Sequence, residues 1–327
     1  MTEHAPAIST MRTLRFHEYG EPADVLRLET APVLEPGRGR IRVTVHACGV
    51  APADWALCRG LFAGDLPRGI GCDVSGTVEA VGEGVADVEV GDLVFGTADF
   101  AGQSSAGTAD RAVMDRWFAV PEGLDLTQAA ALPMAFSTAY WHLARLGLSS
   151  NHTVLINGAG TTIGYAAVQI ALIRGARVIA TAGDTYAQQL RDLGATVVGY
   201  GDGLADRVKA ISDHPADIVF DTAPAGGALP DLVQIAGGDP KRVLTCSDII
   251  AAQALGVRDS FHEDPATATD AERFGAMPEF AQLAAEGKFA VPVAGTFPLD
   301  EWRTALKISL TGHAHGKLLL LPGGARG

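Results

Sequence analysis

Hydrophobic and polar positions follow two different rhythms along this chain. Between about residues 11 and 124, short runs alternate apolar with polar residues, as at 41–47 and 74–81. This alternation has the period of a β-strand that buries one face. Glycine and proline interrupt the runs at short intervals, so this part of the chain is predicted to form a small barrel-like sheet.

After about residue 121, the pattern changes to continuous apolar runs separated by segments of helical spacing. The predicted strands are 153–156, 176–181, 197–198, 218–221 and 242–245, and the predicted helices are 127–148, 165–174, 185–193, 204–211 and 228–236. Apolar strands that alternate with helices are typical of a parallel, doubly wound sheet. The last part of the chain adds predicted helices at 278–286 and 299–310 and strands at 291–297 and 317–321.

Length and charge narrow the classes of function. A chain of 327 residues is long enough for two domains. The net charge of −13 argues against nucleic acid or an anionic membrane as a partner. The four cysteines form no CxxC pair, which favours reduced thiols over a disulfide framework. We see no signal peptide and no apolar run near the ~20 residues that a bilayer needs, and we expect a cytoplasmic protein.

Residues 157–164 read Asn-Gly-Ala-Gly-Thr-Thr-Ile-Gly and lie between a predicted buried strand and a helix. Glycines let a pyrophosphate approach the backbone, and the helix N-terminus offers N–H groups and the positive end of its dipole. The alternative is an ordinary tight turn between strand and helix. The candidate cofactor-binding residues of this glycine turn are Gly158, Ala159, Gly160, Thr161, Thr162, Ile163 and Gly164.

The residues at the end of the next predicted strand indicate whether the site would bind the ribose of NADH or the 2′-phosphate of NADPH. Residues 181–186 contain no lysine or arginine, and Asp184 would repel a 2′-phosphate. These residues favour NADH over NADPH.

Several motifs occur in order along the chain and carry a family resemblance. They are Gly-Glu-Pro-Ala-Asp-Val-Leu at 20–26, Gly-Val-Ala-Pro-Ala-Asp-Trp at 49–55, Gly-Cys-Asp-Val-Ser-Gly-Thr-Val-Glu-Ala-Val-Gly at 71–82, Gly-Asp-Leu-Val-Phe-Gly at 91–96, Ala-Leu-Pro at 131–133, the glycine turn, and His-Gly-Lys at 315–317. From residue 11 to residue 321, the chain resembles the zinc-independent medium-chain dehydrogenase/reductases. Within them it is similar to the quinone-oxidoreductase branch that includes zeta-crystallin.

The resemblance implies an α/β fold, with a GroES-like, β-rich catalytic domain and a Rossmann domain with a doubly wound parallel sheet. The expected boundaries are a disordered tail at 1–10, the catalytic domain at 11–126, the Rossmann domain at 127–265 and a segment at 266–327 that returns to the catalytic domain. The implied reaction is hydride transfer from NADPH, with NADH as an alternative, to a quinone or an activated C=C bond of a small molecule. A homodimer is expected by analogy.

The resemblance also suggests further residues that would contact the cofactor. They are Gly183 and Asp184, where relatives carry ligands of the 2′-phosphate, Tyr200, which matches a tyrosine near the adenosine phosphate, Thr222 and Lys317. For Lys317, the alternative is a lysine exposed at the end of a strand.

Zinc ligands of the related zinc enzymes are replaced in this chain. Ala51 stands where those enzymes have a cysteine, Cys72 and Asp73 stand where they have a His-Glu pair, and residues 95–118 contain no cysteine. A zinc site needs three or four converging ligands, so no metal is expected. The glycine turn also departs from the family, because Thr161 and Thr162 replace its inner glycines. These threonines would narrow the space for a pyrophosphate, although a hydroxyl could bond a phosphate oxygen.

Three residues are candidates for catalysis. Thr138 matches a family threonine near the nicotinamide, and the alternative is a hydroxyl at a helix N-terminus. Asp54 matches a family position but also fits a structural hydrogen-bonding role. Phe62 replaces a tyrosine of some relatives and would line the substrate pocket. The remaining donors are Tyr140, Tyr165 and Cys48, with core packing as the alternative for each.

Three functions remain compatible with the sequence. The first is an NAD(P)H-dependent quinone or enone reductase in which solvent supplies the proton. The second is a redox-neutral cyclase, isomerase or lyase on the same scaffold, suggested by the altered glycine turn. The third is a binding or structural protein that keeps the fold.

Overall fold

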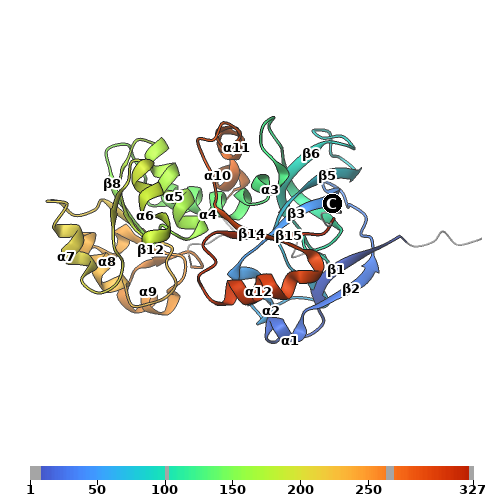
Figure 1. Cartoon of the computed structure of the whole chain (residues 1–327), viewed down its shortest axis with the longest axis horizontal. Helices are drawn as coiled ribbons and strands as arrows, with labels where there is room; N and C mark the ends of the chain where they lie inside the picture. Colours follow the sequence, from blue (N-terminus) through green and yellow to red (C-terminus); the bar gives the residue numbers. More distant parts are fainter. Residues whose placement is uncertain (1–8, 100–102, 263–268, 324–327) are drawn as a thin grey trace, which may run out of the picture. The chain divides into compact units, whose positions relative to one another are not determined.

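The computed structural model of the chain describes residues 9–99, 103–262 and 269–323. The fold is α/β, as predicted, and divides into two compact units. We call them the β-rich unit, whose ranges are Met1–Pro133, Ala281–Lys288 and Val293–Gly327, and the Rossmann unit, whose ranges are Met134–Phe280 and Phe289–Pro292. Figure 1 colours the chain along its sequence and labels its elements.

Two sheets form the β-rich unit. The larger has the order β14 (Val293–Pro298), β15 (Lys317–Leu321), β3 (Ile41–Val50), β5 (Asp73–Val81), β6 (Leu93–Ala98) and β7 (Arg111–Ala119). Because β7 also pairs with β3, four of these strands close into the small barrel that the alternating pattern predicts. The smaller sheet has the order β2 (Arg27–Pro32), β1 (Thr10–Phe16) and β4 (Arg68–Gly69).

The C-terminal segment completes this unit. Strand β15 pairs antiparallel with β3, with Leu318 opposite Val50. Helix α12 (Trp302–Leu310) lies beside α2 (Pro52–Cys58), where Trp55 donates from Nε1 to Ser309 Oγ over 2.7 Å (Figure 1). The other helical elements of the unit are α1 (Pro22–Val25), α3 (Leu126–Ala129) and η2 (Leu299–Glu301).

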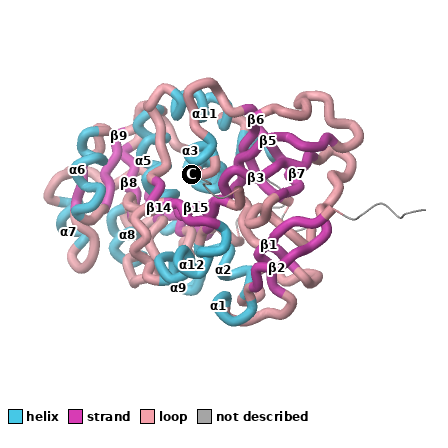
Figure 2. Tube along the Cα trace, turned by 45° about the vertical axis from the view of Figure 1, so that its right-hand side comes forward, coloured by secondary structure: helices cyan, strands magenta, loops and turns pink. Residues whose placement is uncertain are grey.

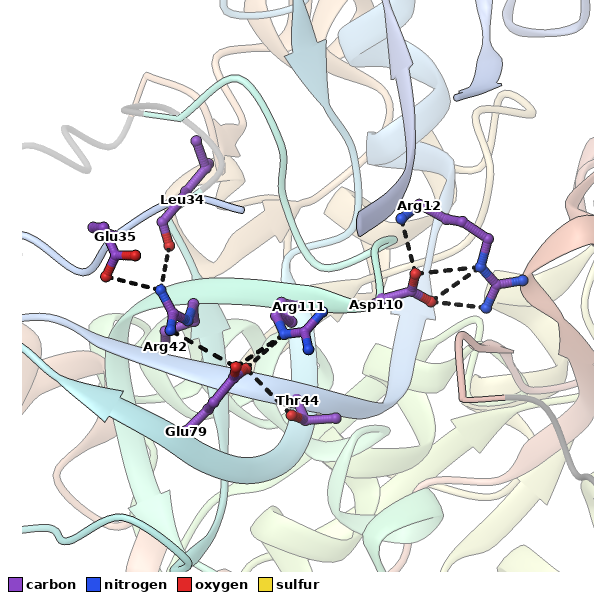
Figure 3. Close-up of polar contacts among 8 residues, drawn as sticks. All are labelled: Arg12, Leu34, Glu35, Arg42, Thr44, Glu79, Asp110 and Arg111. Carbon is purple, nitrogen blue, oxygen red and sulfur yellow. Dashed lines mark hydrogen bonds and ion pairs between the residues drawn. The ribbon is translucent and has the colours of Figure 1, made fainter. Parts of the chain in front are cut away.

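Charged side chains cover one face of the barrel strands. Glu79 of β5 accepts from Arg111 of β7 over 2.8 Å and from Thr44 of β3 over 3.4 Å (Figure 3). Arg42 of β3 reaches both Glu35, at 2.9 Å, and Glu79, at 3.7 Å. These cross-strand pairs leave the opposite face to the apolar core of the barrel.

The Rossmann unit contains one parallel sheet. Its order is β10 (Thr196–Val198), β9 (Arg177–Thr181), β8 (Thr153–Asn157), β11 (Ile218–Asp221), β12 (Val243–Thr245) and β13 (Arg258–Asp259). The strand order reverses between β8 and β11, and ligands of doubly wound sheets bind outside the carboxyl ends of the strands at such a switch point. Figure 2 shows β8 and β9 of this sheet with the helices α5 and α6.

Eight helices and one 3-10 helix lie between residues 132 and 285 of the described chain. They are α4 (Leu132–Arg145), α5 (Thr162–Ile173), α6 (Asp184–Asp192), α7 (Leu204–Lys209), α8 (Leu229–Ile235), η1 (Pro240–Arg242), α9 (Ile249–Leu255), α10 (Asp270–Phe274) and α11 (Met277–Ala285). None of the helices in the described ranges has the length and apolar character that a membrane span requires.

The structure differs from the predicted elements at several places. The helix predicted at 127–148 is two helices, because Pro133 lacks an N–H and its ring would collide with the carbonyl group of Ala129. The helix predicted at 165–174 begins three residues earlier, at Thr162. Helix α9 and the short strand β13 were not predicted. Strand β1 already includes Thr10, whereas residues 1–8 of the predicted tail lie outside the described residues.

Candidate functional site

Two glycines of the glycine turn are required by the backbone. Gly158 has φ +77, and a Cβ there would lie 2.6 Å from the amide nitrogen of Ala223. A Cβ on Gly164 would lie 2.3 Å from the carbonyl oxygen of Gly158. Gly160 differs, because its Cβ would only touch the ring of Tyr186 at 3.5 Å. The first and last glycines therefore shape the turn, while Gly160 has room for a side chain.

Thr161 ends the turn and begins the helix. Its hydroxyl accepts from the N–H of Gly164 over 2.9 Å, which makes it the N-cap of α5. The same hydroxyl donates to Thr222 Oγ1 over 3.0 Å. Thr222 in turn donates to the carbonyl groups of Asn157 and Gly158, at 2.9 and 3.0 Å. Both hydroxyls thus hold the turn together.

Three amides of this region have no hydrogen-bond partner among the residues that the structure describes. The N–H of Gly158 bonds to Thr181 Oγ1, and that of Ala159 bonds to the carbonyl group of Thr181. Within the described ranges, the N–H groups of Gly160, Thr162 and Ile163 make no hydrogen bond. They open a twelve-residue helix, whose N-terminal end carries the positive pole of the helix dipole. This geometry suits an anionic group such as a diphosphate.

The predicted adenosine side of the site lies at the start of α6. Gly183 is the N-cap of this helix, and a Cβ there would lie 3.4 Å from the ring of Tyr200, whose side chain is exposed. Asp184, the first residue of α6, is exposed as well. In the adjacent loop, the guanidinium group of Arg207 donates to the carbonyl groups of Gly199, Gly201 and Asp202.

A charged cluster is buried in the β-rich unit. Lys317, at the start of β15, places Nζ 2.5 Å from Asp73 Oδ2, and both residues are buried. The prediction that Lys317 ends a strand exposed is wrong, because Asp73 draws the ammonium group inward. A Cβ on Gly49 would lie 2.4 Å from Lys317 Cε, so the lysine side chain passes where only glycine leaves room. Burial alone would lower the pKa of Lys317, but the charge and hydrogen bond of Asp73 raise it above its usual value.

Asp54 is buried next to this ion pair. Its Oδ1 accepts from the N–H of Gly71 and its Oδ2 from the N–H of Ala51, each over 2.7 Å. Asp54 therefore ties the start of α2 to the loop before β5. Burial raises the pKa of Asp54 to about 6, against the opposing effect of the Lys317 charge and the two backbone bonds.

The other catalytic candidates occupy different settings. Thr138 is half-buried in the middle of α4, so the alternative of a hydroxyl at a helix N-terminus is wrong. Phe62 is 60% exposed and has φ 52, a conformation that a bulky residue rarely adopts. The guanidinium group of Arg68 donates to the carbonyl group of Phe62 over 2.5 Å. Asp54 and Phe62 belong to the β-rich unit and Thr138 to the Rossmann unit.

The two thiols near the buried ion pair are neutral. Burial raises the pKa of both Cys48 and Cys72 well above the usual value, and Asp54 and Asp73 raise it further.

In the described part of the chain, no group of three or more His, Cys, Asp or Glu side chains is arranged to hold a metal ion.

Four polar residues at the carboxyl ends of the parallel strands were not among the predicted site residues. Asn157, Thr181, Asp221 and Thr245 are the last residues of β8, β9, β11 and β12, and all four are buried. The signal was present, because each apolar run ends in a hydrogen-bonding side chain. Their mutual contacts depend on the order of the strands in the sheet, which no local sequence pattern shows.

Comparison with known proteins bears on this geometry. Residues 37–131 match the family model of the alcohol dehydrogenase GroES-like domain, and residues 162–243 match that of the zinc-binding dehydrogenase domain. The quinone oxidoreductase of Rattus norvegicus is 28% identical over 95% of this chain and 98% of that protein. An alcohol dehydrogenase superfamily protein from Novosphingobium aromaticivorans has a TM-score of 0.80 at 28% identity, covering 95% of this chain and 99% of that one. The quinone oxidoreductase of Coxiella burnetii has a TM-score of 0.72 at 25% identity, covering 96% and 99%.

A GroES-like domain together with a Rossmann domain that has open amides at its glycine turn defines an NAD(P)H oxidoreductase. More narrowly, the chain belongs to the medium-chain dehydrogenase/reductases, in the branch of the quinone oxidoreductases.

Proposed function

We propose that this protein reduces a quinone or an activated C=C bond of a small molecule with a nicotinamide cofactor, and that it does so without zinc. The observation that carries the proposal is the set of three amides, at Gly160, Thr162 and Ile163, that have no partner in the described part of the chain and lie at the switch point of the parallel sheet. The similarity to a rat quinone oxidoreductase over nearly its whole length supports the choice of acceptor.

The residues of the Rossmann unit would bind the cofactor through its diphosphate. The amides of Gly160, Thr162 and Ile163 would donate to phosphate oxygens, and Gly183 with Tyr200 would flank the adenosine ribose. Thr161 and Thr222 would act indirectly, because their hydroxyls already hold the turn. When bound, the nicotinamide would supply the hydride.

Four residues are proposed to act near the reaction. Thr138 is half-buried in α4, where its hydroxyl has no hydrogen-bond partner among the described residues, and it would contact the nicotinamide or the substrate. Phe62 would line the substrate pocket, which its exposed ring and its left-handed backbone support. Asp54 would position α2 and the Gly71 loop through its two backbone bonds, and Lys317 would hold Asp73 beside it.

Of the two nicotinamide cofactors, the local residues favour NADH. Asp184 is exposed at the start of α6, where it would repel a 2′-phosphate. The donors of Arg207 are directed to three carbonyl groups of its own loop. We expect a lower dissociation constant for NADH than for NADPH by fluorescence titration.

The binding step is tested with Gly160→Ala. Its added Cβ meets only the Tyr186 ring at an ordinary contact distance, so the cofactor-free protein should unfold at the wild-type temperature. The methyl group would crowd the phosphate, and we expect the dissociation constant of NADH to rise about tenfold. Gly199→Ala is the control, because a Cβ there meets nothing within 4 Å.

The reaction is tested by following NADH oxidation with a benzoquinone and with an aliphatic enone as acceptors. We expect turnover of at least one acceptor, unchanged by a zinc chelator, and a reduced kcat in Thr138→Val. Loss of activity on chelation would overturn zinc independence. If the protein bound neither NADH nor NADPH, the redox function would be wrong and a redox-neutral enzyme on this scaffold would be favoured.

A further inference from the structure

Four buried side chains form a continuous row across the Rossmann sheet. In the order of neighbouring strands, they are Thr181 of β9, Asn157 of β8, Asp221 of β11 and Thr245 of β12. Thr181 Oγ1 donates to Asn157 Oδ1 over 2.7 Å, and Asn157 Nδ2 donates to Asp221 Oδ1 over 2.8 Å. From the other side, Thr245 Oγ1 donates to Asp221 Oδ2 over 2.7 Å. We call these four residues the polar row.

The charge of Asp221 fixes which atoms donate and which accept hydrogen bonds along the polar row. An ionised carboxylate only accepts hydrogen bonds, so both neighbours must donate to it. The NH₂ group of Asn157 therefore faces Asp221, and its carbonyl oxygen faces Thr181. Since Thr181 has a single hydroxyl proton, which goes to Asn157, the lone pairs of its oxygen remain to accept a further bond.

That remaining bond comes from the glycine turn. The N–H of Gly158 donates to Thr181 Oγ1 over 2.9 Å, while the carbonyl oxygen of Gly158 accepts from Thr222 over 3.0 Å. The same carbonyl oxygen also accepts from the N–H of Thr161 over 2.9 Å. Gly158 is thus held at both its N–H and its carbonyl group in a left-handed conformation. Its orientation decides where the following amides, at Gly160, Thr162 and Ile163, point.

We propose that Thr181 and Asn157, anchored by Asp221, are positioning residues for the dinucleotide phosphates. They act on the cofactor only through the Gly158 peptide, which they hold so that the open amides converge on one anion. This inference rests on the proposed function, because it assumes that a dinucleotide binds at the turn. Thr245 lies at the opposite end of the polar row and is linked to Gly158 only through Asp221, Asn157 and Thr181, so it should not contribute to cofactor binding.

The two threonines of the polar row allow a matched test. Thr181→Val and Thr245→Val each remove one buried hydroxyl from the same row and keep the side-chain shape. Both variants should lower the unfolding temperature to a similar degree. Only Thr181→Val should weaken the binding of NADH. Its dissociation constant and KM for NADH should rise about tenfold, and its kcat at saturating NADH should stay within twofold of wild type. Thr181→Ser, which keeps the hydroxyl, should restore the affinity.

Amide hydrogen exchange of Gly158 in the cofactor-free protein provides a readout that needs no ligand. Its protection should fall in Thr181→Val and persist in Thr245→Val. Equal NADH affinity in wild type and Thr181→Val, or equal weakening by both valine variants, would overturn the positioning role while leaving the reductase function intact. Wild-type protein that binds neither NADH nor NADPH would overturn both, whatever the exchange of Gly158 showed.

Discussion

Asp221 in the Rossmann unit and Asp73 in the β-rich unit are both buried, but they have different partners. Asp221 is surrounded by neutral donors, namely Asn157, Thr245 and the N–H of Ala223. Asp73 faces the Lys317 ammonium group. Burial raises the pKa of Asp221 above its usual value, and the bonds from Thr245 and Asn157 oppose that shift.

The difference shows two ways of burying a carboxylate. Replacing a neutral donor or acceptor by another group of the same shape lowers the free energy of unfolding only modestly, because only dipoles are rearranged. An ion pair that loses one member leaves an uncompensated charge in a medium of low dielectric constant. Stability should therefore depend more on the charge of Lys317 than on the charge of Asp221.

The largest effect is expected for Lys317→Met. It leaves Asp73 and Asp54 buried together without their cation, and the free energy of unfolding should fall by about 3–5 kcal/mol in urea denaturation. The double variant Asp73→Asn/Lys317→Met removes both charges of the pair and should recover most of this loss. A single variant as stable as wild type would show that the pair does not stabilise the fold.

The second largest effect is expected for the pH dependence of the free energy of unfolding, to which Asp54 contributes. Its pKa in the folded protein is about 6, above the ordinary value of 3.8. The folded state therefore binds the proton more tightly, and the stabilisation present at low pH is lost as pH rises through 6. Relative to Asp54→Asn, wild type should lose about 2 kcal/mol between pH 4.5 and 7 in urea denaturation. A difference between the two proteins that does not vary with pH would exclude this effect.

A smaller effect is expected for Asp221→Asn. The amide oxygen can still accept from Asn157, and the amide NH₂ can donate to Thr245 once that hydroxyl rotates. The free energy of unfolding should change by about 1 kcal/mol or less, and the dissociation constant of NADH by less than threefold. Asp221→Leu serves as the contrast, because it removes both acceptor oxygens of the side chain. It should weaken the binding of NADH about as much as Thr181→Val does. A loss in Asp221→Asn as large as in Lys317→Met would contradict the comparison.

The smallest effect is expected for the ion pairs of the barrel surface. Glu79→Gln removes the charge shared by Arg42 and Arg111 (Figure 3), and the Glu79 side chain is 31% exposed. Such pairs contribute below about 1 kcal/mol, and salt reduces the contribution further. In low salt, urea denaturation should show a slightly lower free energy of unfolding for Glu79→Gln than for wild type. In high salt, this difference should disappear.

Much of the fold could be predicted from local patterns. The alternating runs predicted the barrel, and the apolar runs with helical segments predicted the parallel sheet, because side-chain periodicity reflects which faces are buried. The start of α5 was placed too late, since Thr161 caps the helix through a contact that periodicity does not show. Gly158 and Gly164 were predicted as cofactor-binding residues from their spacing, and the structure shows why the turn needs glycine at both positions.

The sequence by itself determined the two kinds of β-structure, the glycine turn and the family of this protein, because these follow from neighbours along the chain. Only the tertiary structure decided that Lys317 turns inward to Asp73 and that Thr181, Asn157, Asp221 and Thr245 form one row. These residues are far apart in sequence. Lys317 meets Asp73 because β15 lies next to β3, which in turn pairs with β5. The residues of the polar row meet because crossover connections place β9, β8, β11 and β12 side by side, and no local pattern encodes either order.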